Sequence, residues 1–418
     1  MKICWFHLMP YRELPEDFRE KNDSVWVDID SRLFDPERAH IMYNDYMDEL
    51  EFAAIQGFDA ICVNEHHNNG YGIMPSPNLI ASALARRTRD TAICVMGNSL
   101  SLYNPPIRVA EEFAMIDCIS GGRLIAGFPV GTPMDTCYAY GHNPSTLRQR
   151  YYEANDLIIR AWTEPEPFSF NGRWNQQRYV NIWPRPVQKP RPPIWIPGGG
   201  SIETWRWCAE LDYVYAYLSY FGYVAGEETM MGFWREMENA GKDKNPFRAG
   251  FLQFVGVAGS REEAMKIYRE PAEYFYGRCL HVDPKFAAAP GYTSEATMRA
   301  KIGSQVQQAA NYFPELARDM EHIVERGYVV VGSPDEVAEK LRHVAKHFNV
   351  GHFLLNLQFG NMSTDLAKYN TELFAKKVLP QITDLFEDEW EDHWWPTGMT
   401  REKPVVPAPV FARREAAE

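Results

Sequence analysis

The sequence predicts an α/β fold, a TIM-type (β/α)8 barrel with insertions and a C-terminal arm. Short apolar runs alternate with longer amphipathic segments about eight times along the chain. The runs are also too uniformly apolar for a sheet with one face in water. Such alternation is typical of a parallel sheet covered by helices. Eight units favour closure into a barrel over an open doubly wound sheet, which stays the alternative.

The apolar runs are the predicted strands. They span Lys2–Met9, Phe58–Val63, Ala92–Met96, Arg123–Phe128, Ile194–Pro197, Tyr213–Leu218, Phe251–Ala258 and Gly351–Leu357. Helices are predicted between them from apolar spacings of three and four residues and from end signals such as Gly57 and Ser76-Pro77. They span Pro36–Gln56, Ser76–Arg87, Pro106–Ile119, Ser145–Trp162, Ile202–Glu210, Gly226–Gly241, Arg261–Arg278, Pro334–Phe348 and Thr364–Val378.

Three segments interrupt the alternation. Residues 164–193 are rich in proline and lack periodicity, and residues 282–327 are mostly polar and are predicted to form a helical insertion. Residues 387–418 combine acidic residues with Trp390, Trp394, Trp395 and the run VVPAPV. Because so many aromatic rings favour burial, we expect an arm that packs on the body or on a second subunit, with terminal disorder as the alternative. The predicted division is a barrel over residues 1–386 and an arm over residues 387–418.

Composition and charge argue against several classes of protein. Lys and Arg number 43 against 56 Asp and Glu, and the net charge of −13 opposes binding to nucleic acid. The seven cysteines are scattered without a C-x-x-C pair, as is typical of free thiols in a reducing cytoplasm. No apolar run approaches the roughly 18 residues that span a bilayer. We therefore expect a soluble cytoplasmic protein that binds neither nucleic acid nor membrane.

An unusually polar run, Asn64-Glu65-His66-His67-Asn68-Asn69, follows the second predicted strand. In a parallel barrel the chemistry lies where strands end. Neighbouring side chains of an extended chain point to opposite faces, so His66 and His67 do not readily share a metal ion. A neutral imidazole can donate and accept near pH 7, which favours an acid–base or hydrogen-bonding role for one of them. A polar loop with one satisfied histidine stays the alternative.

Two further strand ends have ligand-binding patterns. In Met96-Gly97-Asn98-Ser99, Gly97 permits close approach of a flat ligand, and the Asn98 amide offers a donor and an acceptor for an imide-type ring. Gly198-Gly199-Gly200-Ser201 lies between a strand and a helix, where backbone N–H groups and the helix N-terminus suit a phosphate. A plain tight turn is the alternative. The pattern is neither a Rossmann fingerprint nor a Walker motif.

Taken in order, these motifs resemble the bacterial luciferase-like flavin-dependent monooxygenases. The resemblance covers roughly residues 1–380 and rests on Gly57-Phe58-Asp59, Glu65-His66-His67, Gly72, Pro75-Ser76-Pro77, Asn104–Glu112, Asp117, Ser120–Arg123 and Gly198–Ser201. Tyr138, Tyr140-Gly141, Arg148, Arg150 and Glu153 match the long-chain members of the family. The combination in order is specific, whereas each piece alone is not.

The resemblance implies a flavin-dependent monooxygenase, the oxygenase component of a two-component system. Reduced FMN (FMNH2) from a separate NAD(P)H:flavin reductase would react with O2 to give a C4a-(hydro)peroxyflavin. This species would oxygenate a small, largely hydrophobic organic substrate. The family also implies a homodimer.

The resemblance also assigns roles to residues. His66 matches the active-site histidine, with Glu65 beside it either fixing its tautomer or capping the loop. Asn98 and Ser99 match the strand-three bulge that cradles the isoalloxazine and often contains a non-prolyl cis peptide. Tyr138 is expected to contact the cofactor, and Gly199, Gly200 and Ser201 match the phosphate-binding turn.

One departure from luciferase affects the predicted site. Pro129 and Val130 stand where luciferase has a reactive Cys followed by Arg, so the phosphate must be neutralised elsewhere and nothing supports light emission. Two other functions stay open: a deazaflavin (F420)-dependent dehydrogenase, which shares the fold, and a non-catalytic flavin-binding subunit. The insertion and arm favour the oxygenase over the first. Retention of His66, Asn98 and the glycine turn together argues against the second.

Overall fold

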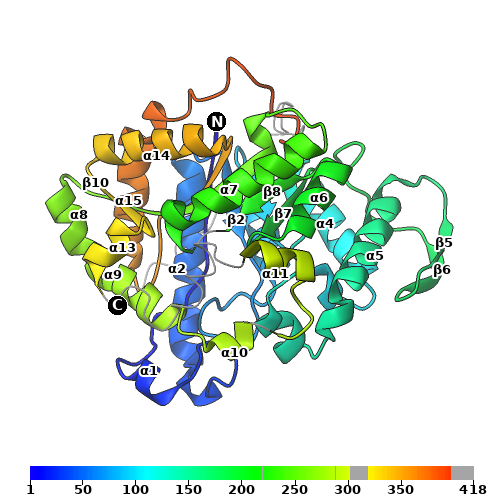
Figure 1. The fold of residues 1–418 in the computed structure, drawn as a ribbon, viewed down its shortest axis with the longest axis horizontal. Coiled ribbons are helices and arrows are strands. Elements are labelled where there is room, and N and C mark those ends of the chain that lie inside the picture. Colours follow the sequence, from blue (N-terminus) through cyan, green and yellow to red (C-terminus); the bar gives the residue numbers. More distant parts are fainter. Residues whose placement is uncertain (219, 288, 302–318, 397–418) are drawn as a thin grey trace, which may run out of the picture.

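Eight parallel strands close into a barrel with helices around it (Figure 1). The structure is a computed structural model and describes residues 1–218, 220–287, 289–301 and 319–396. The barrel strands are β1 (Lys2–Phe6), β2 (Ala60–Val63), β3 (Ala92–Val95), β4 (Leu124–Gly127), β7 (Ile194–Gly198), β8 (Val214–Tyr217), β9 (Ala249–Val257) and β11 (His352–Asn356). Each strand pairs with the next, and β9 closes the ring by pairing with both β8 and β11. The predicted TIM barrel is confirmed.

The long helices form close to where the apolar periodicity predicts them. They are α2 (Pro36–Ile55), α3 (Pro77–Arg87), α4 (Ile107–Ser120), α5 (Pro144–Thr163), α6 (Ile202–Leu211), α7 (Gly222–Asn239), α14 (Pro334–Phe348) and α15 (Thr364–Lys377). The helix predicted over Arg261–Arg278 is instead divided into α8 (Arg261–Ile267), α9 (Arg269–Tyr274) and a π-helical turn, Phe275–Cys279. Pro271 lies in the first turn of α9, the position in a helix where a missing N–H costs least.

Side chains of the barrel strands alternate between the helices and the interior. Trp5 faces the helices, because its Nε1 donates to Oγ1 of Thr371 on α15 at 3.1 Å. His7 does so too, since its Nε2 contacts Oε2 of Glu49 on α2 at 3.1 Å. Residues of the opposite parity therefore face the barrel interior.

Strand β9 has different neighbours along its length. β11 occupies one edge of β9. On the other edge, the first three residues of β9 pair with β8, and Phe254–Val257 pair with the extra strand β10 (Val329–Gly332). β10 is not among the predicted strands, although it is a short apolar run like β2 and β3.

The proline-rich segment 164–193 contains a hairpin that projects from the barrel (Figure 1). Its strands are β5 (Phe168–Asn171) and β6 (Gln176–Val180). The Glu153 carboxylate on α5 accepts hydrogen bonds of 2.7–2.9 Å from the backbone N–H groups of residues 173–175, which holds the hairpin turn against α5.

The described parts of segment 282–327 contain three short helices, where the sequence predicts a helical insertion. They include α10 (Pro284–Ala287), α11 (Glu295–Lys301) and α13 (Met320–Glu325), while residues 288 and 302–318 lie outside the described residues. One further short helix, α1 (Phe18–Lys21), belongs to the loop after β1 and is not predicted.

The described part of the predicted arm packs beneath the barrel of its own chain. Trp394 donates from Nε1 to the carbonyl oxygen of Asp212 at 3.0 Å. The Arg248 guanidinium carbon lies over the Trp394 ring, 4.7 Å from the ring centre. Trp395 stacks on His352 of β11 with ring centres 6.0 Å apart. Residues 397–418 lie outside the described residues, and the boundary at residue 387 stays a prediction.

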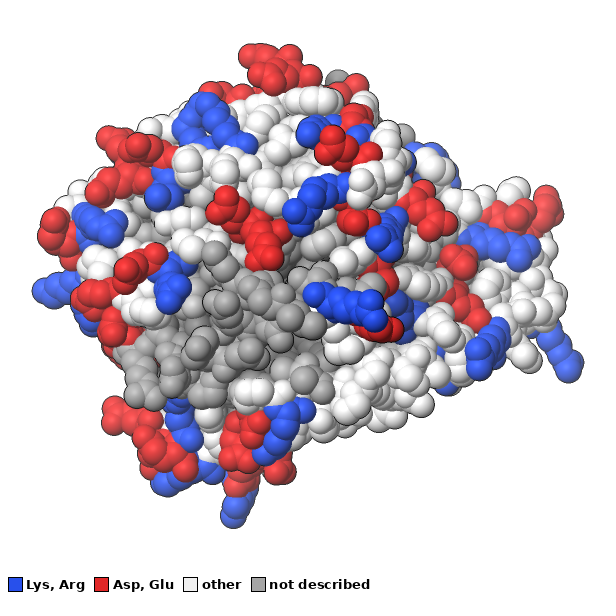
Figure 2. Space-filling model, in the orientation of Figure 1, with Lys and Arg blue, Asp and Glu red and all other residues white. Residues whose placement is uncertain are grey.

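Acidic and basic side chains intermingle on the face seen in Figure 2. All seven cysteines are free thiols. Among the described residues no helix combines the length and the apolar character needed to cross a membrane.

Candidate functional site

His66 follows the end of β2 and is fixed by Asp135, a carboxylate that the sequence does not single out. Its Nδ1 lies 3.0 Å from Oδ2 of Asp135, and the rings of Trp26 and Tyr71 contact it edge-on with centres 4.9 and 4.8 Å away. Because a carboxylate only accepts, Nδ1 holds the proton and Nε2 is left for another partner. His66 is therefore oriented as a proton acceptor or, when protonated, as a donor.

Asp135 lies in a π-helical turn, Met134–Ala139, and is almost fully buried. It also accepts hydrogen bonds from Trp26 Nε1 at 2.8 Å, from the His67 backbone N–H at 2.9 Å and from Thr132 Oγ1 at 3.0 Å. Burial by itself raises the pKa of Asp135, but the neighbouring His66 and these hydrogen bonds outweigh it and hold the pKa below its usual value. Asp135 is therefore ionised and keeps the His66 tautomer fixed.

Glu65 has partners of its own and does not fix His66. Its Oε2 accepts from the Ser99 backbone N–H at 2.6 Å, and its Oε1 accepts from the Tyr103 hydroxyl at 2.7 Å. The Nε2 of His67 lies 3.2 Å from the same carboxylate. The two histidines thus have different carboxylates beside them. Within the described residues, no three His, Cys, Asp or Glu side chains lie together in a way that would hold a metal ion.

The strand-three bulge contains a cis peptide between Met96 and Gly97. Gly97 lies so close to β4 that a Cβ there would be 1.9 Å from the Gly127 carbonyl oxygen. Asn98 is fully buried and donates from Nδ2 to the Tyr103 hydroxyl at 2.8 Å, but its Oδ1 accepts no hydrogen bond from a described residue. A buried acceptor without a protein donor fits a ligand N–H such as that of an imide ring.

The glycine turn after β7 meets an arginine from α5. Ser201 is the N-cap of α6, and Arg148 donates from Nη2 to Ser201 Oγ at 3.1 Å and from Nη1 to Thr204 Oγ1 at 3.2 Å. With the Tyr152 hydroxyl at 3.5 Å, the partners of Arg148 among the described residues are hydroxyl groups and not carboxylates. A Cβ on Gly199 would meet nothing within 4 Å. An unpaired guanidinium beside the positive end of a helix suits an anion.

Glu203, in the first turn of α6, joins the insertion to this turn. Its carboxylate accepts from Ser201 Oγ at 2.8 Å, from Thr297 Oγ1 at 2.6 Å and from the Ser294 hydroxyl. Burial opposes ionisation, but the three hydroxyls outweigh it and lower the pKa of Glu203 to about 2. The start of α11 is thereby held against the predicted phosphate turn, a contact that the sequence does not predict.

Tyr138 is the predicted cofactor residue that lies apart from these groups. It is 44% exposed, its hydroxyl donates to the Lys285 carbonyl oxygen at 3.3 Å, and its ring meets that of Phe286 edge-on. It therefore packs on α10 and not on the glycine turn.

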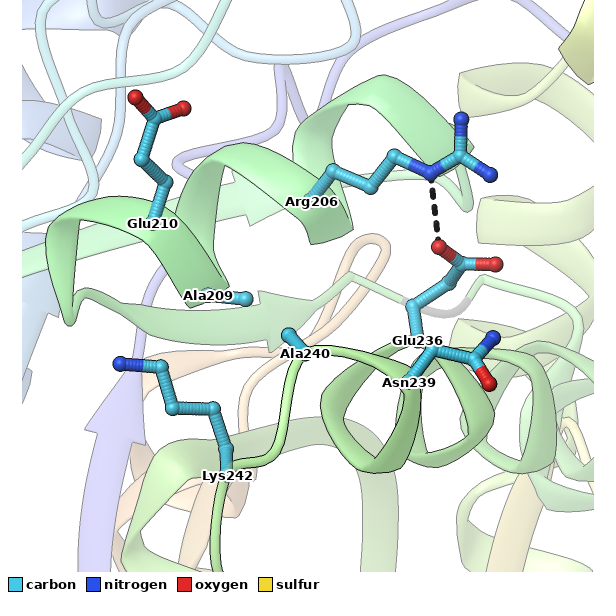
Figure 3. Close-up of a pocket in the computed structure, with 7 residues that line it drawn as sticks. All are labelled: Arg206, Ala209, Glu210, Glu236, Asn239, Ala240 and Lys242. Carbon is cyan, nitrogen blue, oxygen red and sulfur yellow. Dashed lines mark hydrogen bonds and ion pairs between the residues drawn. The ribbon is translucent and has the colours of Figure 1, made fainter.

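A cavity of about 510 Å³ adjoins His66. Its wall is mainly apolar and includes Leu14, Ile29, Leu33 and Ile73. A second hollow of about 510 Å³ lies between α6 and α7, where Arg206 donates to Glu236 at 2.7 Å (Figure 3). That hollow is lined by charged and small residues and contains none of the predicted site residues, so the cavity at His66 is the better candidate for an organic ligand.

Comparison with known proteins gives the family. The family model described as luciferase-like monooxygenase matches residues 35–348. Limonene 1,2-monooxygenase of Rhodococcus erythropolis is 25% identical over 337 residues, 78% of this chain and 78% of that protein. 4-Hydroxyprotoasukamycin monooxygenase of Streptomyces nodosus subsp. asukaensis is 24% identical over 356 residues, 82% of this chain and 88% of that protein. The oxygenase component of flavin-dependent trigonelline monooxygenase of Acinetobacter baylyi is 29% identical over 180 residues, 41% of this chain and 48% of that protein.

Solved structures share the fold. The oxygenating constituent of 3,6-diketocamphane monooxygenase of Pseudomonas putida, in complex with FMN, has a TM-score of 0.69 at 20% identity and covers 91% of this chain and 98% of its own. An F420-dependent secondary alcohol dehydrogenase has a TM-score of 0.61 at 17% identity, and the match covers 92% of this chain and 99% of that protein. Because the family model matches most of the sequence and the barrel agrees with it, this chain belongs to the luciferase-like monooxygenase family and is an oxidoreductase.

Proposed function

We propose that this chain binds FMN and uses its reduced form with O2 to oxygenate a small, largely hydrophobic organic substrate. The observation that supports this most is Arg148, which has no carboxylate partner among the described residues and is held at the N-terminus of α6 by Ser201 and Thr204. A phosphate at this turn would neutralise it. Arg148 would then provide the charge that Pro129 and Val130 do not.

The fit of the ring to the strand-three bulge rests on shape and on Asn98. Gly97 and Gly127 bring β3 and β4 into close contact without side chains, which suits a flat ring. The unused Oδ1 of Asn98 would accept a ring N–H. Reduced FMN, when bound, supplies the electrons that activate O2. The chain orients the ring and keeps water away from it.

His66 is the proposed catalytic residue. Asp135 fixes its Nδ1 proton, so Nε2 is the atom that would hold or move a proton at the reacting oxygen. The apolar cavity at His66 would take the hydrophobic part of the substrate. Asp135 acts through His66 and is a positioning residue.

A separate NAD(P)H:flavin reductase is the proposed source of reduced FMN. The similar trigonelline enzyme is described as an oxygenase component, which supports this division of labour. A homodimer also stays a prediction. The tryptophans of the arm no longer argue for it, because Trp394 and Trp395 pack on their own barrel.

The function is tested by mixing the purified chain and chemically reduced FMN with oxygenated buffer. We expect the chain to delay the appearance of oxidised FMN and hydrogen peroxide. His66→Ala should shorten that delay by about 10²–10⁴-fold, the usual scale of acid–base assistance. His67→Ala, whose imidazole lies beside Glu65, is the matched control and should change it little. Equal effects of the two variants would remove His66 from the chemistry.

The alternative of F420-dependent hydride transfer is tested in the same preparation. The structural likeness to the F420-dependent alcohol dehydrogenase shows only the shared barrel. Anaerobic reduction of F420 by an alcohol in the presence of the chain, together with no effect on reduced FMN, would replace the oxygenase proposal.

A further inference from the structure

Three buried carboxamides at the mouth of the barrel have no hydrogen-bond partner among the described residues. They are Asn64, Asn356 and Gln358, with exposed fractions of 2%, 0% and 0%. In each of them both the amide nitrogen and the amide oxygen are unpartnered within that part of the chain. Buried polar groups are rarely left in this state unless a ligand or ordered water meets them.

The strand register places two of these amides on the inner face of the barrel. Cys62 is level with Phe6 on β1, so Asn64, two residues further, is level with Leu8. Leu355 is level with the outward-facing Trp5, so Asn356 points inward. Gln358 lies two residues beyond Asn356, at the level of Leu8.

The amides therefore surround one part of the mouth. β1 lies between β2 and β11, so Asn64 and Gln358 flank Leu8 at a spacing of about 10 Å along the sheet, which the inward curvature of the barrel shortens. The proposed phosphate turn, at the end of β7, lies across the barrel: β2, β3 and β4 separate it from β1. The three amides therefore lie away from the proposed phosphate turn, and Asn64 lies on the strand next to the proposed ring site.

The unpartnered atoms define the chemistry that would satisfy them. They are three N–H₂ donors and three carbonyl acceptors, all uncharged. A hydrocarbon would satisfy none of them. A ketone or a carboxylate only accepts and would leave the three oxygens unmet. A group with a neutral N–H next to a carbonyl meets both kinds of atom.

We propose that Asn64, Asn356 and Gln358 form a substrate-specificity site for a neutral carboxamide or lactam group. The inference rests on the proposed function, because the molecule that binds these amides is taken to be the substrate of the proposed monooxygenase. It refines that function, because it names the polar group of the substrate that the three side chains would recognise.

The test compares three ring compounds of equal size: 2-piperidone, cyclohexanone and cyclohexane. Their dissociation constants are measured by ligand-observed NMR on the full chain, with and without oxidised FMN. The double variant Asn356→Leu/Gln358→Leu should lower the affinity ratio of 2-piperidone to cyclohexanone by about tenfold, as expected when hydrogen bonds to a buried group are lost. Asn64→Leu, on the other strand, should lower it in the same direction.

Melting temperatures and FMN affinities of the same variants show whether the amides bind the ligand. Because leucine removes unpartnered polar atoms at similar volume, the variants should melt at the wild-type temperature or above it. A lower melting temperature would mean that the amides are satisfied within the fold, and an unchanged affinity ratio would mean that they do not touch the ligand. Weaker FMN binding in the double variant would assign the amides to the flavin. If the chain binds no flavin at all, the proposed function fails while the lactam-to-ketone ratio still reports on the amides.

Discussion

Replacing Arg148 with methionine should weaken FMN binding by roughly 30- to 1000-fold. The guanidinium is 3.1 Å from Ser201 Oγ and 3.2 Å from Thr204 Oγ1, so a phosphate on that turn would lie about 4 Å from it. Two unit charges at that distance and an effective dielectric constant of about 20 attract by about 4 kcal/mol. The ionised Glu203 nearby reduces this gain, so we expect about 2–4 kcal/mol, which corresponds to the stated range.

The assay is quenching of flavin fluorescence, with FMN and riboflavin titrated in parallel. Riboflavin lacks the phosphate, so its affinity should change by less than about threefold in Arg148→Met. Arg150→Met is the matched control, because the Arg150 guanidinium lies 4.2 Å from the Trp174 ring centre and faces the hairpin. Unchanged FMN affinity, or an equal loss for riboflavin, would refute the placement of the phosphate.

Four further perturbations follow from the structure. Gly199→Val should weaken FMN binding about tenfold in the same titration and leave the melting temperature unchanged, because its Cβ enters open space. Asp135→Asn should cost about 2–4 kcal/mol in urea unfolding, since the amide nitrogen cannot accept from His66. His7→Gln should make the free energy of unfolding fall less steeply as the pH drops below 6.5. Burial lowers the pKa of His7, so the unfolded chain takes up the proton first as the pH falls. The wild-type native state therefore loses up to about 1.4 kcal/mol of stability per pH unit. Chemical unfolding at several pH values measures the slope. Trp394→Ala should cost about 3–5 kcal/mol, and a loss below about 1 kcal/mol would mean that the arm does not stabilise the barrel.

The barrel could be predicted because its signal is local. Each strand is a short apolar run and each long helix has its own apolar stripe, so the alternation is visible without knowledge of contacts. The hairpin of β5 and β6 had a signal too. Phe168 and Phe170 alternate before Asn171-Gly172, a dipeptide typical of hairpin turns, although the loop in the structure is the four residues 172–175.

The site could be predicted only in part, because its decisive contacts join distant segments. His66 can be predicted because it follows a strand end, yet its carboxylate lies 69 residues away in a π-helical turn. Only the family resemblance singles out Arg148, and its contact with Ser201 depends on how α5 packs against α6. No periodicity in a single sequence encodes such pairs.

The two ends of the barrel differ in the partners of β9. At the base all eight strands form one ring, and Trp394 and Trp395 cover it from below. Toward the mouth, β9 pairs with β8 as far as Phe251 and with β10 from Phe254 onward. The ring of eight strands is therefore interrupted on the side where the strands end and the site lies. Substitutions that reshape this end for a new ligand need not weaken the base.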